Sequence, residues 1–595
     1  YTAWDLAFYT GNTSANFVAL AGNITIQGST LASNSGDALS TANTAIGNAY
    51  SSIYTAITGA ANPRTATTTG FATANTGTAS TGKYWGVQLK SNFFALNNPY
   101  TVTSGTAPSS GGTVTIAGSV LNAVIPTTVD TGAGVTLWDG SNVYAYGAIT
   151  INGYGIGGRT VADGVIASTG ANHGLVIWST TTTLRSYSSS ITLAGYANGY
   201  KTVGNYTAGL ESAGILIYSD ANLIRGYTDV SLTGIDMRGI GIYLAAFSSG
   251  SNGVVADTGS VNIQSINNTS DWYSTYLRQS VAATAGAVNI SAAGQFGLCL
   301  DNSQSAITAA GNVNINAYTS LYTALYLSTG VSDTIRSTAG SIIISATDAG
   351  SNTDYYAVNE GSTTSITANQ NIIFQGASLA APTPGSLTSA AGAVSPVFAS
   401  ANTGSAMTGP SATRTLSWAG AMTATNGYIS LSGNSVVSGL MTASNASGGV
   451  VLSGAGTYNL SNTSNNVSTL AASIGTSGMT FVNGSALKIG TVNSITGITS
   501  GALTLTAAGL TGSSNITPSS SSTITINNSS GSPEYSGIIS GSTAVTKSGV
   551  IPTNQPSVLF CVVPVLPATS RPSALAFPPV PLLSSTTPFK SEVIR

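Results

Sequence analysis

The sequence predicts an all-β fold, a right-handed single-stranded parallel β-helix (β-solenoid). Three observations predict it. Short apolar runs recur in a fixed order, apolar and polar residues alternate within the runs, and only 6% of the 595 residues are charged. Self-similarity at a period of about 20 to 50 residues is typical of stacked repeats, none of which buries its apolar face alone.

The first set of repeats has a period of 40 residues. Each copy holds three apolar runs in the same order, which indicates three strands per repeat. The first runs are Gly134–Trp138, Gly174–Trp178 and Gly214–Tyr218, the second are Val143–Tyr146, Leu184–Tyr187 and Ile224–Tyr227, and the third are Ala148–Ile151, Ser190–Leu193 and Asp229–Leu232.

Later repeats are shorter but keep this order. The third run recurs at intervals of 27, 25, 29 and 30 residues, beginning at Val261, Val288, Val313, Ile342 and Ile372. Within it, Val288 and Ile290 flank Asn289, and a period of two is typical of a strand with one buried face. The other runs of these repeats are Leu298–Leu300, Leu325–Leu327 and Tyr356–Val358, followed by Ile307, Ile335 and Ile366.

Three short strands in each repeat match one coil of a parallel β-helix. Stacked coils place equivalent residues about 4.8 Å apart, so that the backbone of each strand pairs with the coils on either side. Antiparallel sandwiches predict modules of about 100 residues. A β-propeller predicts blades of about 40 to 50 residues, which fits only the first three copies.

The regular pattern does not cover the whole chain. A strand is expected at residues 21–26, then an insertion at 33–81 that is partly helical at 42–57. The resulting division is 1–110 for N-terminal coils with a long insertion, 111–380 for regular repeats, 381–425 for an irregular loop-rich break, 426–549 for further coils, and 550–595 for a proline-rich tail, disordered or frame-shifted.

Composition excludes several classes of protein. No apolar stretch reaches the roughly 18 residues of a membrane-spanning helix. With 42% hydrophobic residues and a net charge of −2, the chain lacks the signature of disorder. Sixteen Lys and Arg against 18 Asp and Glu cannot form a broad basic surface, so nucleic-acid binding is excluded. Cys299 and Cys561 form no metal or disulfide pattern.

Two groups of residues resemble bacterial autotransporter passengers and filamentous-haemagglutinin-like exoproteins. One group is the strand runs such as Gly286–Ile290 and Gly311–Ile315. The other is Tyr535–Gly541 followed by Val545–Gly549, which resembles the start of the passenger-associated repeat of autotransporters. The resemblance covers about residues 110–549 and rests on structural repeats rather than on site motifs.

The resemblance implies a secreted β-helix displayed at the bacterial outer membrane and cell surface for adhesion, aggregation or biofilm formation. Its implied partners are a host or environmental surface or glycan, or like molecules on other cells. Export would use an outer-membrane translocator that this chain does not contain. A structural surface-layer or filament protein is the second hypothesis, because an uncharged rod of strands would serve it equally well.

Residues for catalysis are scarce, so we expect no enzyme, no cofactor and no metal. His173 is the only histidine, and it is interpreted as a loop residue before the Gly174 strand. The glycine-rich run at 153–158 is not followed by a helix pattern, so phosphate binding is weakly supported. Calcium-binding nonapeptide repeats are absent from the sequence.

A polysaccharide hydrolase or lyase is the third hypothesis, since parallel β-helices host such enzymes and they need paired carboxylates. The candidates are Asp220, Asp229, Asp236, Arg225 and Arg238. The alternative is that the aspartates form turns through local hydrogen bonds and the arginines are solvated.

Aromatic residues at equivalent positions of the repeats give the candidate binding surface. The hypothesis is a stacked ladder that binds glycans or another surface, because Tyr and Trp combine an apolar face with a polar tip. The alternative is that these rings pack under loops or on one another. The candidates are Trp138, Trp178, Tyr218, Tyr243, Tyr276 and Tyr326, of which Tyr326 most clearly faces outward; Cys299 is also expected to point away from the core.

Overall fold

The computed structural model divides the chain into two compact units, residues 1–427 and 428–595. The structure describes residues 5–10, 15–31, 84–99, 102, 107–122, 132–138, 140–157, 172–178, 181–198, 212–218, 223–236, 239–245, 253–267, 273–300, 306–319, 322–327, 334–348, 358–360, 365–376, 379–381, 386–389, 394–397, 416–418, 420–446, 448–527, 535–541 and 543–548. The predicted insertion at 33–81 with its helix and the tail at 550–595 lie outside these residues.

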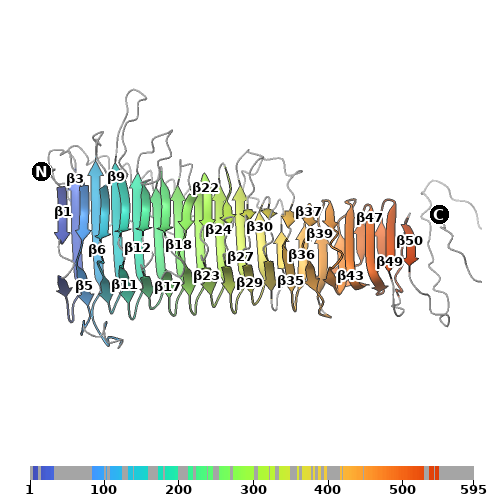
Figure 1. Cartoon of the computed structure of the whole chain (residues 1–595), viewed down its shortest axis with the longest axis horizontal. Coiled ribbons are helices and arrows are strands. Elements are labelled where there is room, and N and C mark those ends of the chain that lie inside the picture. The colour runs from blue at the N-terminus through green and yellow to red at the C-terminus, as the bar shows by residue number, and fades with distance from the viewer. Residues whose placement is uncertain are drawn as a thin grey trace, which may run out of the picture. The chain divides into compact units, whose positions relative to one another are not determined.

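The first unit is built from coils of three strands (Figure 1). The first strand of each coil pairs in parallel with the first strand of the next coil. These strands are β1 (Asp5–Thr10), β4 (Tyr84–Leu89), β7 (Gly132–Trp138), β10 (Asn172–Trp178), β13 (Ala213–Tyr218), β16 (Ile240–Ala245), β19 (Tyr273–Leu277), β22 (Phe296–Leu300), β25 (Leu325–Leu327), β28 (Val358–Glu360), β31 (Leu379–Ala381) and β34 (Leu416–Trp418).

The second strands form a separate parallel sheet. They are β2 (Asn16–Val18), β5 (Asn92–Ala95), β8 (Val143–Ala145), β11 (Thr183–Ser186), β14 (Leu223–Gly226), β17 (Val254–Ala256), β20 (Val281–Ala283), β23 (Ala306–Ala309), β26 (Thr334–Ser337), β29 (Ser365–Ala368), β32 (Ser386–Ser389) and β35 (Ala421–Ala424).

The third strands of the coils are also parallel to one another. They are β3 (Ile24–Leu31), β6 (Val114–Asn122), β9 (Ile149–Gly157), β12 (Ile191–Asn198), β15 (Val230–Asp236), β18 (Val261–Asn267), β21 (Val288–Gly294), β24 (Val313–Thr319), β27 (Ile342–Asp348), β30 (Ile372–Gly376) and β33 (Val394–Val397).

The second unit repeats this arrangement with irregularities. Its strands are β36 (Tyr428–Ser432), β37 (Ser435–Val437), β38 (Met441–Ala443), β39 (Gly449–Ser453), β40 (Tyr458–Leu460), β41 (Asn466–Val467), β42 (Thr469–Ser473), β43 (Met479–Ile489), β44 (Thr491–Val492), β45 (Ile495–Thr496), β46 (Ile498–Ser500), β47 (Leu503–Thr511), β48 (Ile516–Pro518), β49 (Ser522–Asn527) and β50 (Thr543–Ser548). Their pairings are parallel except in the β44–β45 hairpin, whose turn residues Asn493 and Ser494 have positive φ.

The predicted all-β fold of stacked parallel strands is confirmed, and the sequence repeats are equivalent coils. Trp138, Trp178 and Tyr218 lie opposite one another in register. Ile191 likewise lies between Ile149 and Val230. In the later repeats Leu325 lies opposite Val358, the last residue of the predicted run at 356–358.

The second runs also align as predicted: Leu184 lies between Val143 and Ile224. The sequence predicts a loop-rich break at residues 381–425, much of which lies outside the described residues. The residues described there include β32 to β35, which pair in parallel with strands before and after them.

The core consists of aliphatic columns inside the coils. Val230, Val261, Val288, Val313 and Ile342 form one column in register, and each is 0% exposed. Burying a side chain of this size contributes about 1.5–3 kcal/mol. Because each residue packs on the equivalent residue of the next coil, cohesion depends on the stack and not on any single coil.

Small residues line a seam where the first and third strands approach each other. A Cβ added to Gly153 would overlap the carbonyl oxygen of Gly174, and one added to Gly195 would overlap that of Gly214. The next coil has Gly234 and Gly241 at the equivalent positions, and the coil after that has Ser265 and Ser274, whose hydroxyl oxygens are 2.8 Å apart. We call these facing positions the seam.

Candidate functional site

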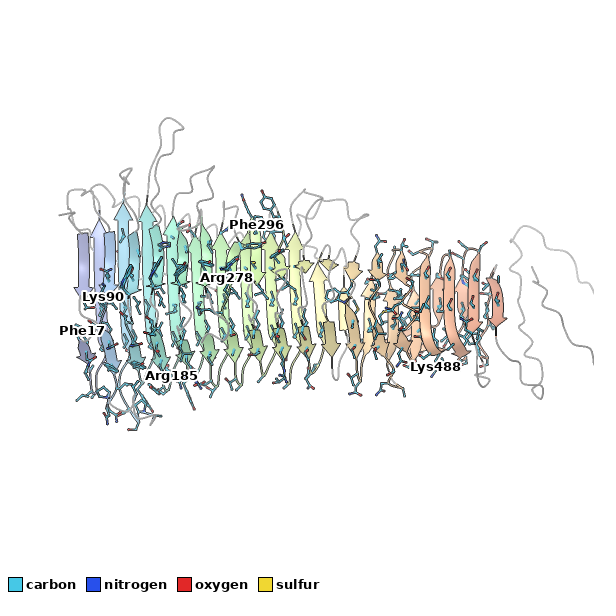
Figure 2. All side chains as sticks on the ribbon, viewed as in Figure 1. Phe17, Lys90, Arg185, Arg278, Phe296 and Lys488 are labelled. Atoms are coloured by element: carbon cyan, nitrogen blue, oxygen red, sulfur yellow. The ribbon has the colours of Figure 1, made fainter. Side chains whose placement is uncertain are left out.

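Three of the predicted aromatic residues form a ladder across consecutive coils. The ring centroids of Trp138 and Trp178 are 6.1 Å apart at 10°, and those of Trp178 and Tyr218 are 4.7 Å apart at 24°. The ammonium of Lys90, labelled in Figure 2, lies 5.7 Å from the Trp138 ring centroid. Parallel pairing in register produces this ladder, because equivalent residues of neighbouring strands lie one above the other.

The ladder rings cover one another's faces. A ring sandwiched between two neighbours presents only its edge to solvent, whereas a sugar stacks on a ring face. Trp178 and Tyr218 also pack against a small apolar cluster that includes Val176 and Leu216, each 5% exposed. The three ladder rings therefore pack on one another, which is the arrangement that the alternative hypothesis for the aromatic residues describes.

The other three predicted aromatics lie in a different column. Tyr243 and Tyr276 are paired in register, two positions along the strand from the ladder, which Ala245 continues. Their rings meet edge-on, with centroids 5.2 Å apart. Tyr326 belongs to the same column but is separated from Tyr276 by Cys299. The six candidates thus occupy two columns, and Tyr243 packs against the same apolar cluster as Trp178 and Tyr218.

Cys299 follows the predicted alternation, since its column is that of Tyr276 and Tyr326 and not that of the core leucines. It is nevertheless only 1% exposed. The outward face of β22 is therefore itself covered at this position, which the alternation of the strand could not indicate.

Aromatics that the sequence analysis did not select complete this second group. Tyr273 lies 4.9 Å from Phe296 and 5.9 Å from Tyr326, measured between ring centroids. Phe296, labelled in Figure 2, stacks on Tyr322 at 4.2 Å. Tyr273 and Phe296 are paired in register, whereas Tyr273 and Tyr326 meet from inequivalent positions two coils apart.

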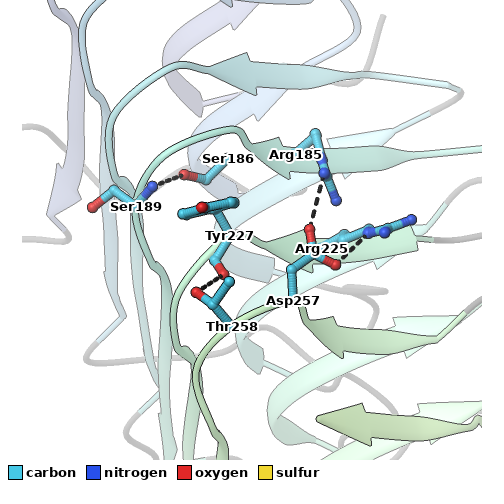
Figure 3. A network of polar contacts seen from close by, with 7 residues as sticks. All are labelled: Arg185, Ser186, Ser189, Arg225, Tyr227, Asp257 and Thr258. Carbon is cyan, nitrogen blue, oxygen red and sulfur yellow. Dashed lines mark hydrogen bonds and ion pairs between the residues drawn. The ribbon is translucent and has the colours of Figure 1, made fainter. Parts of the chain in front are cut away.

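A polar network links three consecutive coils on the sheet of second strands (Figure 3). Arg185 and Arg225 are paired in register, and the carboxylate of Asp257 bridges them. Its Oδ2 lies 3.0 Å from Arg185 Nη2, and its Oδ1 accepts a hydrogen bond of 2.8 Å from Arg225 Nε. Like charges directly opposite on a sheet repel, so the carboxylate offsets this repulsion.

Tyrosines surround the network in two adjacent columns. Tyr144 precedes Arg185 in one column, and in the other Tyr146 and Tyr187 precede Tyr227. The guanidinium carbon of Arg185 lies 5.2 Å from the Tyr187 ring centroid. We call the seven residues the tyrosine–arginine strip: Tyr144, Tyr146, Arg185, Tyr187, Arg225, Tyr227 and Asp257.

Two tyrosines of the strip, Tyr144 and Tyr187, are held in the neutral form near pH 7. Burial raises the pKa of Tyr144 and of Tyr187, and the nearby Arg185 charge partly opposes the shift at Tyr187. The strip therefore offers neutral phenols beside two guanidinium groups and one carboxylate. Of these residues the sequence analysis had selected only Arg225, because the bridging Asp257 belongs to a later coil.

His173 is not the predicted loop residue. It lies within β10, is 3% exposed, and its Nδ1 accepts a hydrogen bond of 3.1 Å from the backbone N–H of Ala213. Burial lowers its pKa from 6.5 to about 4. The imidazole is thus a neutral part of the packed structure.

The carboxylates proposed for a polysaccharide hydrolase do not form a pair. Asp229 precedes β15 and Asp236 ends it, so about 23 Å of extended strand separates them. Paired catalytic carboxyl groups lie about 5 to 10 Å apart. Asp229 Oδ1 instead accepts a 2.7 Å hydrogen bond from Ser260 N of the next coil, and Asp236 is 0% exposed. Asp220 and Arg238 lie outside the described residues.

Other sites are not seen in the described part of the chain. It holds no group of three or more His, Cys, Asp or Glu side chains that could bind a metal ion. Among the same residues, no helix has the length and apolarity to cross a membrane. Gly153, from the glycine-rich run, belongs to the seam. No protein-family model, curated protein or solved structure matches this chain.

Proposed function

We propose that this chain is a secreted, non-enzymatic bacterial surface protein that mediates attachment, aggregation or biofilm formation. In this proposal it is the passenger of an autotransporter-like or two-partner-secreted adhesin, exported by a separate or adjoining translocator. The observation that carries it is the tyrosine–arginine strip, an outward-facing group of binding-type residues fixed on a stack of parallel strands.

The chemistry of the strip supports a binding function. Tyr and Arg are enriched where proteins bind partners, because they offer large contact areas and several hydrogen bonds. Tyr227 is 43% exposed, and the Arg225 side chain is 45% exposed. The backbone beneath them is held by parallel pairing on both sides, so little conformational entropy is lost on binding.

The proposal includes the handedness expected from the sequence, a right-handed single-stranded parallel β-helix. Connections between parallel strands of one sheet are right-handed in the great majority of proteins. An experimental structure of residues 84–376 tests this, and left-handed coils would contradict it.

Attachment is tested with cells that display the chain and with a matched deletion strain. Adhesion to abiotic and host-cell surfaces and cell–cell aggregation are measured for both. We expect the deletion strain to lose at least one of these activities. Equal attachment by both strains on every surface would overturn the proposal.

A structural role as a surface-layer or filament protein is the second candidate. The observation that favours it is the ladders that link coils: rings stack in the Trp138–Trp178–Tyr218 ladder, and Asn289 Nδ2 donates to Asn262 Oδ1 at 2.9 Å. Asn314 continues this second ladder with a 2.8 Å bond to Asn289. Regular filaments of the purified chain in electron micrographs, combined with unchanged attachment of the deletion strain, would favour this candidate.

A further inference from the structure

We infer that the tyrosine–arginine strip binds an acidic linear polysaccharide, whose chain runs along the stack from coil to coil. The inference rests on the proposed attachment function and names its ligand class. Ligands of this class share an anionic group, a carboxylate or a sulfate, that is carried on a sugar polymer.

Arg225 supplies the anion-binding group. Its Nε is held by Asp257 at 2.8 Å, which fixes the plane of the guanidinium, and among the described residues Asp257 is its one hydrogen-bond or ion-pair partner. Its outer nitrogens extend beyond the carboxylate in Figure 3. With 45% of the side chain exposed, both can donate to the two oxygens of an anion.

The charge of the strip favours an anion. Arg185 and Arg225 carry two positive charges, and Asp257 neutralises one of them, since it bonds to both. One positive charge therefore remains on a surface where charge is rare, in a chain with 6% charged residues. The Asp257 side chain is 16% exposed against 45% for Arg225, so an incoming anion meets mainly the guanidinium.

The tyrosines supply contacts for sugar rings. Tyr227 is 43% exposed and lies in the bend that directly follows β14, two residues after Arg225. Tyr187 and Tyr146 occupy the preceding coils at about 4.8 Å intervals, close to the length of one sugar unit in a linear polysaccharide. Unlike Trp178, Tyr227 has no ring stacked on it among the described residues.

The dimensions of the strip favour a linear polymer over a protein. Two columns across four coils cover a strip about 7 Å wide and about 15 Å long. A stable protein–protein interface needs about 800 Å² on each partner, several times this area. An extended peptide would pair with a strand edge, and the strip lies on a sheet face whose edges are already paired.

Binding of the full chain to polygalacturonate, dextran sulfate and neutral dextran tests the inference. We expect binding to at least one acidic polymer, weakened by NaCl, and no binding to dextran. The tighter acidic polymer identifies the anion as carboxylate or sulfate. Arg225→Gln and Tyr227→Ser should each weaken binding at least about tenfold, whereas Tyr227→Phe keeps the ring and should retain it.

Arg336→Gln is the matched control. Arg336 is an exposed arginine that faces outward from the same sheet, between Thr308 and Thr367, and it lacks the tyrosines of the strip. The Arg336→Gln variant should bind the acidic polymers as tightly as the unmodified chain does. Thermal melting checks that every variant is folded. Equal losses in Arg225→Gln and Arg336→Gln would reduce the effect to general charge and overturn the inference.

The outcomes separate the two proposals. If cells that display the chain attach but the chain binds neither acidic polymer, the polysaccharide site is overturned and the attachment function stands. Polymer binding that depends on Arg225, with attachment equal to that of the deletion strain, leaves the site and overturns the attachment function.

Discussion

Single residues in this chain act through their partners in neighbouring coils. Asp257 bonds Arg185 and Arg225, from two earlier coils, and His173 accepts a hydrogen bond from Ala213 of the next coil. Each contact joins residues 32 or more positions apart in the sequence. The role of such a residue is therefore decided by register between coils.

His173 gives a pH dependence of stability. Its pKa is about 4 in the folded chain, against 6.5 for an exposed histidine, so the unfolded chain binds the proton more tightly. The contribution of His173 to stability is therefore fully present above pH 6.5 and is lost as the pH drops toward 4, by about 3 kcal/mol. Since His173 is the only histidine, its imidazole resonances report this pKa directly.

The control for this effect is His173→Gln, whose side-chain oxygen can accept the Ala213 N–H without titrating. We expect this variant to lose most of the pH dependence between pH 4 and 6.5. A measured imidazole pKa near 6.5 in the folded chain would contradict the prediction.

At the scale of strands, the seam sets how closely the first and third strands approach. Gly195 and Gly214 face each other there, and a side chain at either position would meet backbone that is fixed by parallel pairing. Close packing of this kind has no flexible side chain that can move aside. The seam glycines are thus explained by close contact between the strands.

Gly195→Ala should destabilise the first unit by about 3 kcal/mol or more, because the new methyl group overlaps the Gly214 carbonyl. Gly22→Ala is the matched control, since nothing lies within 4 Å of a Cβ at that position. Its effect should stay within about 0.5 kcal/mol. Denaturant unfolding followed by circular dichroism measures both; equal stabilities would contradict the close approach.

At the scale of the whole molecule, stability is distributed along the stacked coils. Each core residue contacts its equivalents on either side, so stability is approximately a sum of coil and nearest-neighbour contributions. Charge contributes little, because charged residues make up 6% of the chain. A loss of core packing should therefore lower stability much more than the screening of charge does.

Ile290→Ala should remove about 2–5 kcal/mol, because Ile290 is 1% exposed between Ile263 and Ile315. Hydrogen exchange should show the loss of protection mainly in β18, β21 and β24. Thr308→Ala, an outward change on β23, should leave exchange unaltered. A uniform loss of protection from β4 to β30 would indicate global cooperativity instead.

Ionic strength should have little effect on stability. Raising the NaCl concentration from about 0.05 to about 1 M screens surface charges and weakens ion pairs. Because charged residues make up 6% of the chain, this screening should change stability little. The melting temperature of the chain should change by less than about 2 °C. A fall of several degrees would show that ion pairs such as that of Asp257 stabilise the fold substantially.

The sequence by itself determined the parallel coils, because apolar residues at a period of two and repeats of 25 to 40 residues leave few other ways to bury them. It also identified the ladder of Trp138, Trp178 and Tyr218, since ladder residues occupy equivalent repeat positions.

Only the tertiary structure decided which outward residues are available for binding. The sequence does not show that ladder rings cover one another, that Cys299 and His173 are buried, or that Asp257 holds Arg225 with its outer nitrogens exposed. Alternation along a strand gives the direction of a side chain. Its exposure and its partners depend on the coils and strands packed beside it, which no local pattern records.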